Sequence, residues 1–190
     1  MANLSSTYEV LDFWFGAPGS VVHGKPRAEW FRKPDAFDAQ IREWFLPLYE
    51  QAQGGALDEW RESPLTLLAL IIVLDQFPRN MFRDTPRAFA TDAKALDAAR
   101  QMTDRGWDLR LNAVERQFVY LPFEHAEDLE AQRTCMRLFE ALGNPDLTEW
   151  ARKHHVIIER FGRFPHRNAT LGRASTPDEI EFLKQPGSGF

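Results

Sequence analysis

The sequence contains a single cysteine, Cys135, and no group of cysteines and histidines at the spacing of a zinc site. One cysteine cannot form an intramolecular disulfide, which is typical of a reducing compartment. Cys135 has apolar neighbours on an expected helix, so we predict a buried, unreactive thiol. The chain starts without a recognisable signal peptide, and its longest apolar run, residues 65–74, is too short to span a bilayer. These absences predict a cytoplasmic protein that does not enter a membrane.

An excess of positive charge is missing as well. The net charge of −5 argues against a protein devoted to binding nucleic acid. The sequence has no phosphate-binding P-loop, no GxGxxG dinucleotide motif and no GxSxG serine elbow. The length of 190 residues and the hydrophobic content of 44% are typical of one globular domain. We therefore predict a single helical domain over residues 1–190.

Strand signals are nearly absent, whereas helix start and stop signals recur along the chain. Ser63 before a proline predicts a helix start, Gly143 predicts a helix end, and Thr176 with Glu179 has the spacing of a capping box. The pattern predicts about eight helices, at residues 6–15, 35–52, 64–77, 86–105, 113–121, 123–142, 147–161 and 177–184.

The short loops between these helices predict an all-α fold of antiparallel pairs. The pairs would form either a compact bundle or a right-handed superhelix. Pro78 and Pro122 are expected to end the helices before them, because a residue that precedes proline is pushed out of the α region.

Polar residues on apolar helix faces are the candidate functional residues. On the helix 147–161, His154 lies in the middle of an apolar stripe that includes Ile157 and Ile158. On the expected helix 123–142, the apolar line through Cys135 continues backwards through three polar residues, Gln132, Asp128 and His125. Such conflicts between polarity and position are expected where function overrides packing.

Two interpretations of these residues remain open. A carboxylate one turn from an imidazole suits acid–base chemistry, which makes His125, Asp128 and His154 candidate catalytic residues. Alternatively, they are buried polar groups that pair with arginines across a helix interface. Their side chains also contain metal-binding atoms, but no HExxH or similar motif is present, so no metal site is predicted.

The sequence Phe-Pro-(x)-Arg-Asn occurs twice, in residues 77–80 and in residues 164–168. The first follows Asp75, which lies on an apolar face and needs a cation such as Arg79. The second belongs to residues 160–173, which contain four arginines and no acid. Arginines there either bind an anionic ligand or cap helix ends and pair with acids. We expect the two stretches to meet in space as complementary sides of one charged cluster.

Five stretches together resemble the bacterial family called domain of unknown function 924. They are VLDFWFG, LALIIVLDQFPRNMFR, FATDAKAL, YLPFEHAEDLEAQ and IIERFGRFPHRNATLGRASTPDEIEFL. The resemblance runs through nearly the whole chain and implies an all-α fold similar to tetratricopeptide-like helical superhelices, without an established activity. The family's motif positions in this chain are Asp75, Gln76, Arg79, Asn80, His125, Glu127, Asp128, Gln132, His154, Arg163, His166, Arg167 and Asn168.

Three hypotheses follow from these patterns. In the first, His125, Asp128 and His154 act on or bind a small anionic molecule, held by the remaining candidate ligand-binding residues Asp75, Gln76, Arg79, Asn80, Gln132, Arg163, His166, Arg167 and Asn168. In the second, the chain is an adaptor whose exposed aromatic side chains bind a peptide or protein partner. In the third, the polar residues form a buried ion-pair lattice, so that Asp75→Asn or Arg167→Ala chiefly lowers stability. No cofactor or oligomeric state is predicted, and whether the chain is an enzyme is left open.

Overall fold

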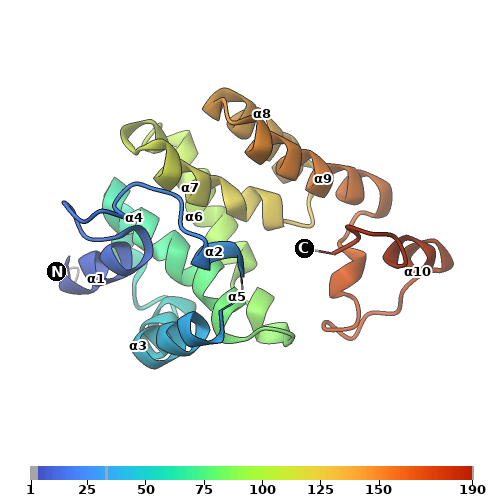
Figure 1. The fold of residues 1–190 in the computed structure, drawn as a ribbon, viewed down its shortest axis with the longest axis horizontal. Helices are drawn as coiled ribbons and strands as arrows, with labels where there is room; N and C mark the ends of the chain where they lie inside the picture. The colour runs from blue at the N-terminus through green and yellow to red at the C-terminus, as the bar shows by residue number, and fades with distance from the viewer. Residues whose placement is uncertain (1–3, 33, 190) are drawn as a thin grey trace. The chain divides into compact units, whose positions relative to one another are not determined.

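The computed structural model describes residues 4–32 and 34–189, and within these ranges the backbone forms helices and turns but no β-strand. The predicted all-α class is confirmed. The α-helices are α1 (Leu4–Phe15), α2 (Glu29–Arg32), α3 (Asp35–Gln53), α4 (Pro64–Ile71), α5 (Phe77–Met81), α6 (Asp92–Asp104), α7 (Ala113–His125), α8 (Leu129–Leu142), α9 (Pro145–Phe161) and α10 (Pro177–Leu183) (Figure 1). Shorter segments are the 3₁₀ turns η1 (Asp58–Glu62), η3 (Pro86–Phe89), η4 (Asp108–Arg110) and η5 (Pro165–Arg167) and the π-helical turn η2 (Ile72–Gln76).

The chain divides into two compact units. Unit 1 comprises residues 1–83 and 87–122, and unit 2 comprises residues 84–86 and 123–190. The single domain over residues 1–190 and the tetratricopeptide-like superhelix stay predictions.

The centre of unit 1 is α4, in which residues 66–71 are all buried. A helix that is apolar on every side is stable only when other elements surround it, and α4 packs against α1, α6 and η1. Its start is as predicted, because the Ser63 hydroxyl accepts a hydrogen bond from Thr66 N. Within the described residues, none of the helices is both long and apolar enough to cross a bilayer.

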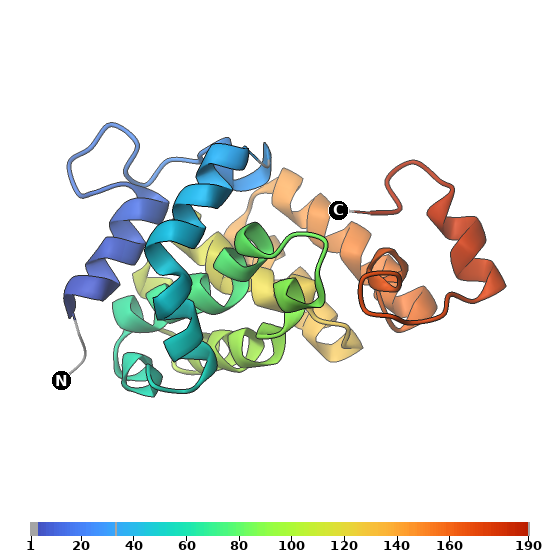
Figure 2. The same cartoon turned by 90° about the horizontal axis from the view of Figure 1, so that it is seen from below.

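An aromatic cluster joins α1 to α3, which run side by side in Figure 2. The Phe13 ring stacks on Phe37 at a centroid distance of 5.2 Å and meets Trp44 and Phe45 edge-on at 5.6 and 5.1 Å. Such pairs add to the stabilisation from burial alone. They attach the N-terminal helix of unit 1 to its core.

The helical backbone does not end at Pro78. α4, η2 and α5 follow one another without a break, and Pro78 occupies the first turn of α5. In a continuous α-helix the N–H of residue 78 would bind Leu74 O, but proline has no N–H. The Thr91 hydroxyl supplies the missing donor to Leu74 O at 2.6 Å. The prediction that Pro78 ends the helix was wrong because a side chain distant in sequence compensates for the proline.

Pro122 also lies inside a helix, since α7 continues through it to His125. The chain breaks instead at residues 126–128, where the Asp128 carboxylate accepts a 2.7 Å hydrogen bond from Ala131 N and starts α8. The expected helix 123–142 was therefore wrong. His125, Asp128 and Gln132 do not share one face of a continuous helix.

Three other helix starts differ from the prediction. α9 begins at Pro145, with Asn144 as its cap, two residues before the predicted start at residue 147. α1 begins at Leu4, two residues before the predicted start at residue 6. The stretch expected to be one helix from residue 86 is divided into η3 and α6, and α6 begins only at Asp92.

Unit 2 contains the antiparallel pair α8 and α9, which lie side by side in Figure 1. Gly143 ends α8 with φ of +76°, a conformation that side chains disfavour. Ile157, Ile158 and Phe164 form a small buried core. The predicted capping box of α10 is confirmed, since Thr176 and Glu179 each accept a hydrogen bond from the other's backbone N–H.

Candidate functional site

The stretch DQFPRN in unit 1 contains a buried ion pair. Asp75 is 0% exposed, and its Oδ1 lies 3.3 Å from Arg79 Nη1. Arg79 also forms a bidentate pair with Asp92 at 2.8 and 2.9 Å, and Gln76 Nε2 donates to Asp75 Oδ2 at 2.6 Å. Burial alone would lower the pKa of Arg79, but Asp92 and Asp75 raise it above its ordinary value. The predicted pairing of Asp75 with Arg79 is confirmed.

Asn80 belongs to a second set of contacts in unit 1. Its Nδ2 donates to Asp38 Oδ1 at 2.7 Å, and Arg83 forms a bidentate pair with the same carboxylate. These two sets of contacts contain all four predicted ligand-binding residues of unit 1, which are Asp75, Gln76, Arg79 and Asn80.

In unit 2, two side chains cover the carboxyl end of α7. Gln132 Nε2 donates to three carbonyl oxygens within residues 123–126, at 2.7 to 3.3 Å. Arg167 Nη1 donates to His125 O at 3.0 Å. The last carbonyls of a helix have no donor within the helix, and a guanidinium also complements the negative end of the helix dipole. Gln132 and Arg167 therefore stabilise the end of the helix that carries His125.

His154 and Glu124 form a buried pair in unit 2, with both residues 5% exposed. His154 Nδ1 lies 2.9 Å from Trp150 O and 3.5 Å from Glu124 Oε1. Since a carbonyl oxygen only accepts hydrogen bonds, Nδ1 carries the hydrogen, and Nε2 of the neutral ring is an acceptor. Burial is the main cause that lowers the pKa of His154 to about 3. The ring is therefore neutral at physiological pH.

Three further groups lie close enough to His154 for their positive charge to lower its pKa further: His125, Arg167 and His166. His166 and His154 each contact the buried Phe164 ring, with centroid distances of 5.6 Å in both cases. The structure thus brings together the predicted residues of the α7 end, α9 and η5. We call Glu124, His125, His154, His166 and Arg167 the histidine cluster.

Two other predicted residues of unit 2, Arg163 and Asn168, meet at a buried carboxylate. Arg163 pairs with both oxygens of Glu179 at 2.7 and 2.8 Å, and Asn168 Nδ2 lies 3.4 Å from Oε2. Thr176 N donates to the same Oε2 at 2.7 Å. The hydrogen bond from Arg163 is the main cause that lowers the pKa of Glu179 to about 2. Arg163 and Asn168 therefore position α10.

Glu127, one of the family's motif residues, connects the end of α7 to the loop before η5. It accepts hydrogen bonds from Arg173 at 2.5 and 2.8 Å and from Phe164 N at 2.8 Å. Burial alone would raise the pKa of Glu127, but these hydrogen bonds lower it. Of the four arginines in residues 160–173, Arg163 and Arg173 pair with carboxylates and Arg167 binds a carbonyl.

Glu124 is the member of the histidine cluster that was absent from the predicted site. The helix break expected at Pro122 separated Glu124 from the residues before the proline. If α7 is continued through the proline, Glu124 follows the buried Tyr120 and Leu121 on the same helix face. A carboxylate on this apolar line is the same signal that identified His154.

Neither the cysteine nor a metal site adds to this cluster. Cys135 is buried, as predicted, and burial raises the pKa of its thiol well above the ordinary value, with a further contribution from Glu124. Among the described residues, no group of three or more histidine, cysteine, aspartate or glutamate side chains is arranged to hold a metal ion.

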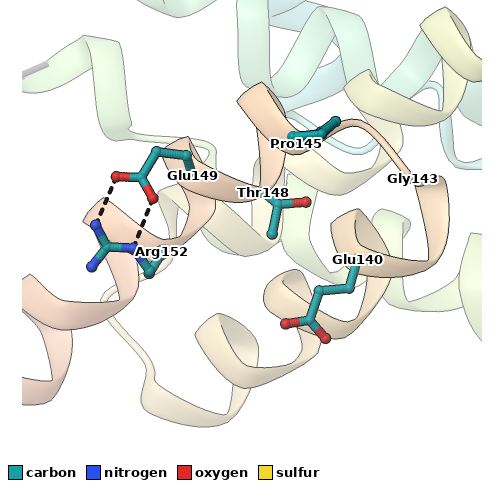
Figure 3. A pocket seen from close by; sticks show the side chains of 6 residues that line it. All are labelled: Glu140, Gly143, Pro145, Thr148, Glu149 and Arg152. Atoms are coloured by element: carbon teal, nitrogen blue, oxygen red, sulfur yellow. Dashed lines mark hydrogen bonds and ion pairs between the residues drawn. The ribbon is translucent and has the colours of Figure 1, made fainter.

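Two surface hollows have lining residues that do not belong to the histidine cluster. One, of about 380 Å³, lies at the turn between α8 and α9 and is lined by residues that include Glu140, Thr148, Glu149 and Arg152 (Figure 3). In that view Glu149 and Arg152 point toward each other, and they form a bidentate pair at 2.7 and 2.8 Å. The other, of about 480 Å³, lies on unit 1 and is lined by Glu9, Phe13, Trp44 and Phe45.

Comparison with known proteins places both units in one family. A bacterial family described as "Bacterial protein of unknown function (DUF924)" matches residues 10–187. The chain belongs to the DUF924 family. This confirms the resemblance seen in the sequence motifs. A solved structure of protein of unknown function ATU0120 from Agrobacterium tumefaciens is 38% identical, with a TM-score of 0.87 over 96% of this chain and 99% of that chain. No curated protein matches the chain.

Proposed function

We propose that this DUF924 protein binds a small anionic molecule at the histidine cluster of unit 2. The observation that carries the proposal is that two imidazoles and one guanidinium, from His125, His166 and Arg167, lie near His154, whose Nδ1 is 3.5 Å from the buried Glu124 carboxylate. Burial of Glu124, His154 and Arg167 beside two half-buried histidines carries a desolvation cost, and ionisable groups in such surroundings concentrate at functional sites.

The charge at His154 favours an anion over a cation. His125, Arg167 and His166 all act on His154 as positive groups and disfavour its protonation. An anion bound among them would reduce this repulsion and raise the pKa of His154. Binding would then be coupled to proton uptake, which gives the proposal a signature that a purely structural cluster lacks.

The orientation of the His154 ring suits contact with a ligand through Nε2. Its Nδ1 is held by Trp150 O on its own helix, which fixes the orientation of the ring. The acceptor Nε2 can then take a proton or a hydrogen bond from the ligand. In the free protein, a pKa of about 3 makes this nitrogen a weak base. Acid–base chemistry by His125 and His154 would require the bound anion to raise that pKa.

The test is an NMR titration of the histidine ring signals of the purified protein. Phosphate, pyrophosphate, citrate and AMP are added one at a time, with sodium chloride at equal ionic strength as the reference. We expect one of these anions to shift the His154 signal and to raise its pKa by about one unit or more, as expected when an opposite charge comes within contact distance. Thermal unfolding of the same samples reports the accompanying stabilisation.

His154→Asn and His155→Asn form a matched pair of variants. Asparagine at position 154 retains a donor near Trp150 O but lacks the Nε2 acceptor, whereas His155 is the half-buried next residue on α9. We expect His154→Asn to abolish the anion-induced stabilisation and His155→Asn to keep it. Equal stabilisation of both variants, or no shift of His154 with any of the four anions, would contradict the proposal.

A further inference from the structure

The Gln132 side chain has a second polar atom besides the nitrogen that covers the end of α7. Gln132 is 0% exposed, and its Nε2 donates to three of the four main-chain carbonyls in residues 123–126. The fourth, His125 O, accepts from Arg167 Nη1 at 3.0 Å. Gln132 and a member of the histidine cluster thus cover the same helix end. The Gln132 amide therefore lies beside the histidine cluster.

The contacts of Nε2 fix the orientation of the Gln132 amide. A carbonyl oxygen only accepts hydrogen bonds, so the nitrogen of the amide has to face the three carbonyls. The reversed amide would set its own oxygen against three others. Because Nε2 and Oε1 diverge from one carbon atom, Oε1 points away from the carbonyls of residues 123–126.

Oε1 of Gln132 is buried, and it accepts no hydrogen bond from any residue that the structure describes. A buried carbonyl oxygen without a donor lowers stability, because it has lost its hydrogen bonds with water. Covering the helix end does not require such an atom, since Arg167 covers His125 O with donors alone. Glutamine at position 132 thus adds a buried acceptor at the helix end, and such an atom calls for a donor.

We propose that Gln132 makes the histidine cluster select an anion that carries its own O–H group, such as hydrogen phosphate or a hydroxy acid. The positive groups around His154 attract the negative charge, and Gln132 Oε1 accepts from the O–H group. An anion without an O–H group would place a lone pair against Oε1 and leave this oxygen unsatisfied, which disfavours it.

This inference rests on the proposed function, because it needs an anion at the histidine cluster, and it adds the substrate class. The two claims concern different properties of the anion. Its charge determines whether it binds at all, whereas its O–H group determines how much more tightly it binds than an anion of the same charge without one. Matched pairs of anions therefore separate the two claims.

The experiment uses two such pairs. At about pH 8, hydrogen phosphate and sulfate are both tetrahedral dianions, but only hydrogen phosphate keeps a proton. Citrate and tricarballylate have the same three carboxylates, and only citrate has a hydroxyl group. Calorimetry measures their affinities for the whole chain at equal ionic strength, and NMR follows the side-chain amide signal of Gln132. In at least one pair, we expect the O–H anion to bind about tenfold more tightly and to shift this signal more.

Three variants identify the acceptor. Gln132→Lys keeps a donor for the carbonyls but has no acceptor, and its added charge acts on both members of a pair, so the ratio of affinities is the readout. Gln132→Met removes donor and acceptor without adding charge. Both should bring the ratio to within about twofold of one. Gln117→Met alters a buried glutamine of unit 1 and should keep the wild-type ratio. Circular dichroism verifies that each variant is folded, and the wild-type ratios require no variant.

Three results would overturn the inference. If both members of each pair bind equally and shift the His154 signal, anion binding stands, and Oε1 is satisfied by a buried water only. If the preference persists in folded Gln132→Met and Gln132→Lys, another acceptor selects the O–H group. If none of the four anions binds, the proposed function fails together with this inference.

Discussion

The two Phe-Pro-(x)-Arg-Asn stretches, one in each unit, use their shared residues in the same way. Phe77 and Phe164 are fully buried anchors. The arginine that follows each donates to a main-chain carbonyl, Arg79 to Asp75 O at 2.9 Å and Arg167 to His125 O at 3.0 Å. His125 O lies at the carboxyl end of α7, where carbonyls need an outside donor, whereas Asp75 O lies within the continuous run of α4, η2 and α5.

The two asparagines have parallel roles as well. Asn80 donates to the Asp38 carboxylate, and Asn168 lies 3.4 Å from the Glu179 carboxylate. Each carboxylate is also paired with a nearby arginine of the same unit, Arg83 in unit 1 and Arg163 in unit 2. The repeated sequence therefore encodes a repeated arrangement: a buried ring, a carbonyl donor, and an amide that shares a carboxylate with an arginine.

The stretches differ in the groups around the motif arginine. Arg79 is bound to two carboxylates, Asp75 and Asp92, which leaves a closed ion-pair set. Arg167 lies over the Phe164 ring at 4.4 Å and near the imidazoles of the histidine cluster. The motif residues therefore stabilise each unit. The charges around the motif differ, and they distinguish the structural ion-pair set of unit 1 from the candidate site of unit 2. That the two stretches meet in space stays a prediction.

The largest loss of stability is expected when Arg79 is removed from the ion-pair set that it forms with Asp75 and Asp92. We expect Arg79→Ala to lower the free energy of unfolding by about 3–5 kcal/mol, because it removes the counterion of the fully buried Asp75. Denaturant unfolding measures the loss. Arg152→Ala breaks an exposed ion pair with Glu149 and should leave stability nearly unchanged. If the two variants lost equal stability, the buried set would have no special structural role.

The histidine cluster should be recognised by its response to acid. The pKa of His154 is about 3 in the folded protein against an ordinary value of 6.5, so the unfolded chain binds the proton first as the pH falls. The contribution of neutral His154 to the free energy of unfolding is fully present above pH 6.5. It decreases below that pH, by about 2 kcal/mol at pH 5. His154→Asn removes this component.

The difference between wild type and His154→Asn isolates His154 from the other groups around it, which are Glu124, His125, His166 and Arg167. Glu127 and Glu179 affect stability at lower pH, because the pKa values of these carboxyls are lowered in the folded protein, to about 2 for Glu179. Unfolding curves between pH 5 and pH 8 suffice. Parallel pH profiles of the two proteins would show that His154 titrates normally.

Substitution of the two asparagines tests whether the motif contributes equally to the stability of both units. Asn80→Ala and Asn168→Ala each remove an amide donor to a paired carboxylate, and each should lower the free energy of unfolding by about 1–3 kcal/mol. Thermal and denaturant unfolding at pH 7 compare them. Asn168→Ala should also leave anion binding at the histidine cluster unchanged. A loss confined to one variant would break the parallel between the stretches.

Thr176→Ala should have the smallest effect. It removes the hydroxyl that accepts from Glu179 N but leaves the Glu179 carboxylate paired with Arg163. Loss of an N-cap side chain lowers stability by about 1 kcal/mol. Thermal unfolding should therefore show a modest shift. A loss as large as that of Asn168→Ala would mean that the cap and the carboxylate pair act as one unit.

Local signals predicted three helix ends whose capping groups are close in sequence. The Ser63, Gly143 and Thr176 signals were all confirmed. Both prolines were wrongly predicted to end helices. At Pro78, the donor to Leu74 O is the Thr91 hydroxyl, seventeen positions beyond Leu74. Propensity rules contain no information about such a partner.

The residues of the candidate site divide in the same way, into those that local spacing predicts and those that only the packing of separate helices brings together. His154 was found because three- and four-residue spacing alone places it on an apolar stripe, and its burial confirms this. Glu124 was not among the predicted catalytic and ligand-binding residues, because the helix break expected at Pro122 separated it from the buried Tyr120 and Leu121. The pairing of Arg79 with Asp92, and of Arg163 with Glu179, follows only from the packing of separate helices.

By itself, the sequence determined the all-α class, most helix ends, the family and the polar residues that lie on apolar faces. These depend on hydrogen bonds and periodicities that span a few residues. The tertiary structure decided which arginines are bound to carboxylates, that His154 lies beside Glu124, and which charged groups lie near His154. These depend on which side chains packing brings within a few ångströms, where Coulomb attraction and desolvation are strong.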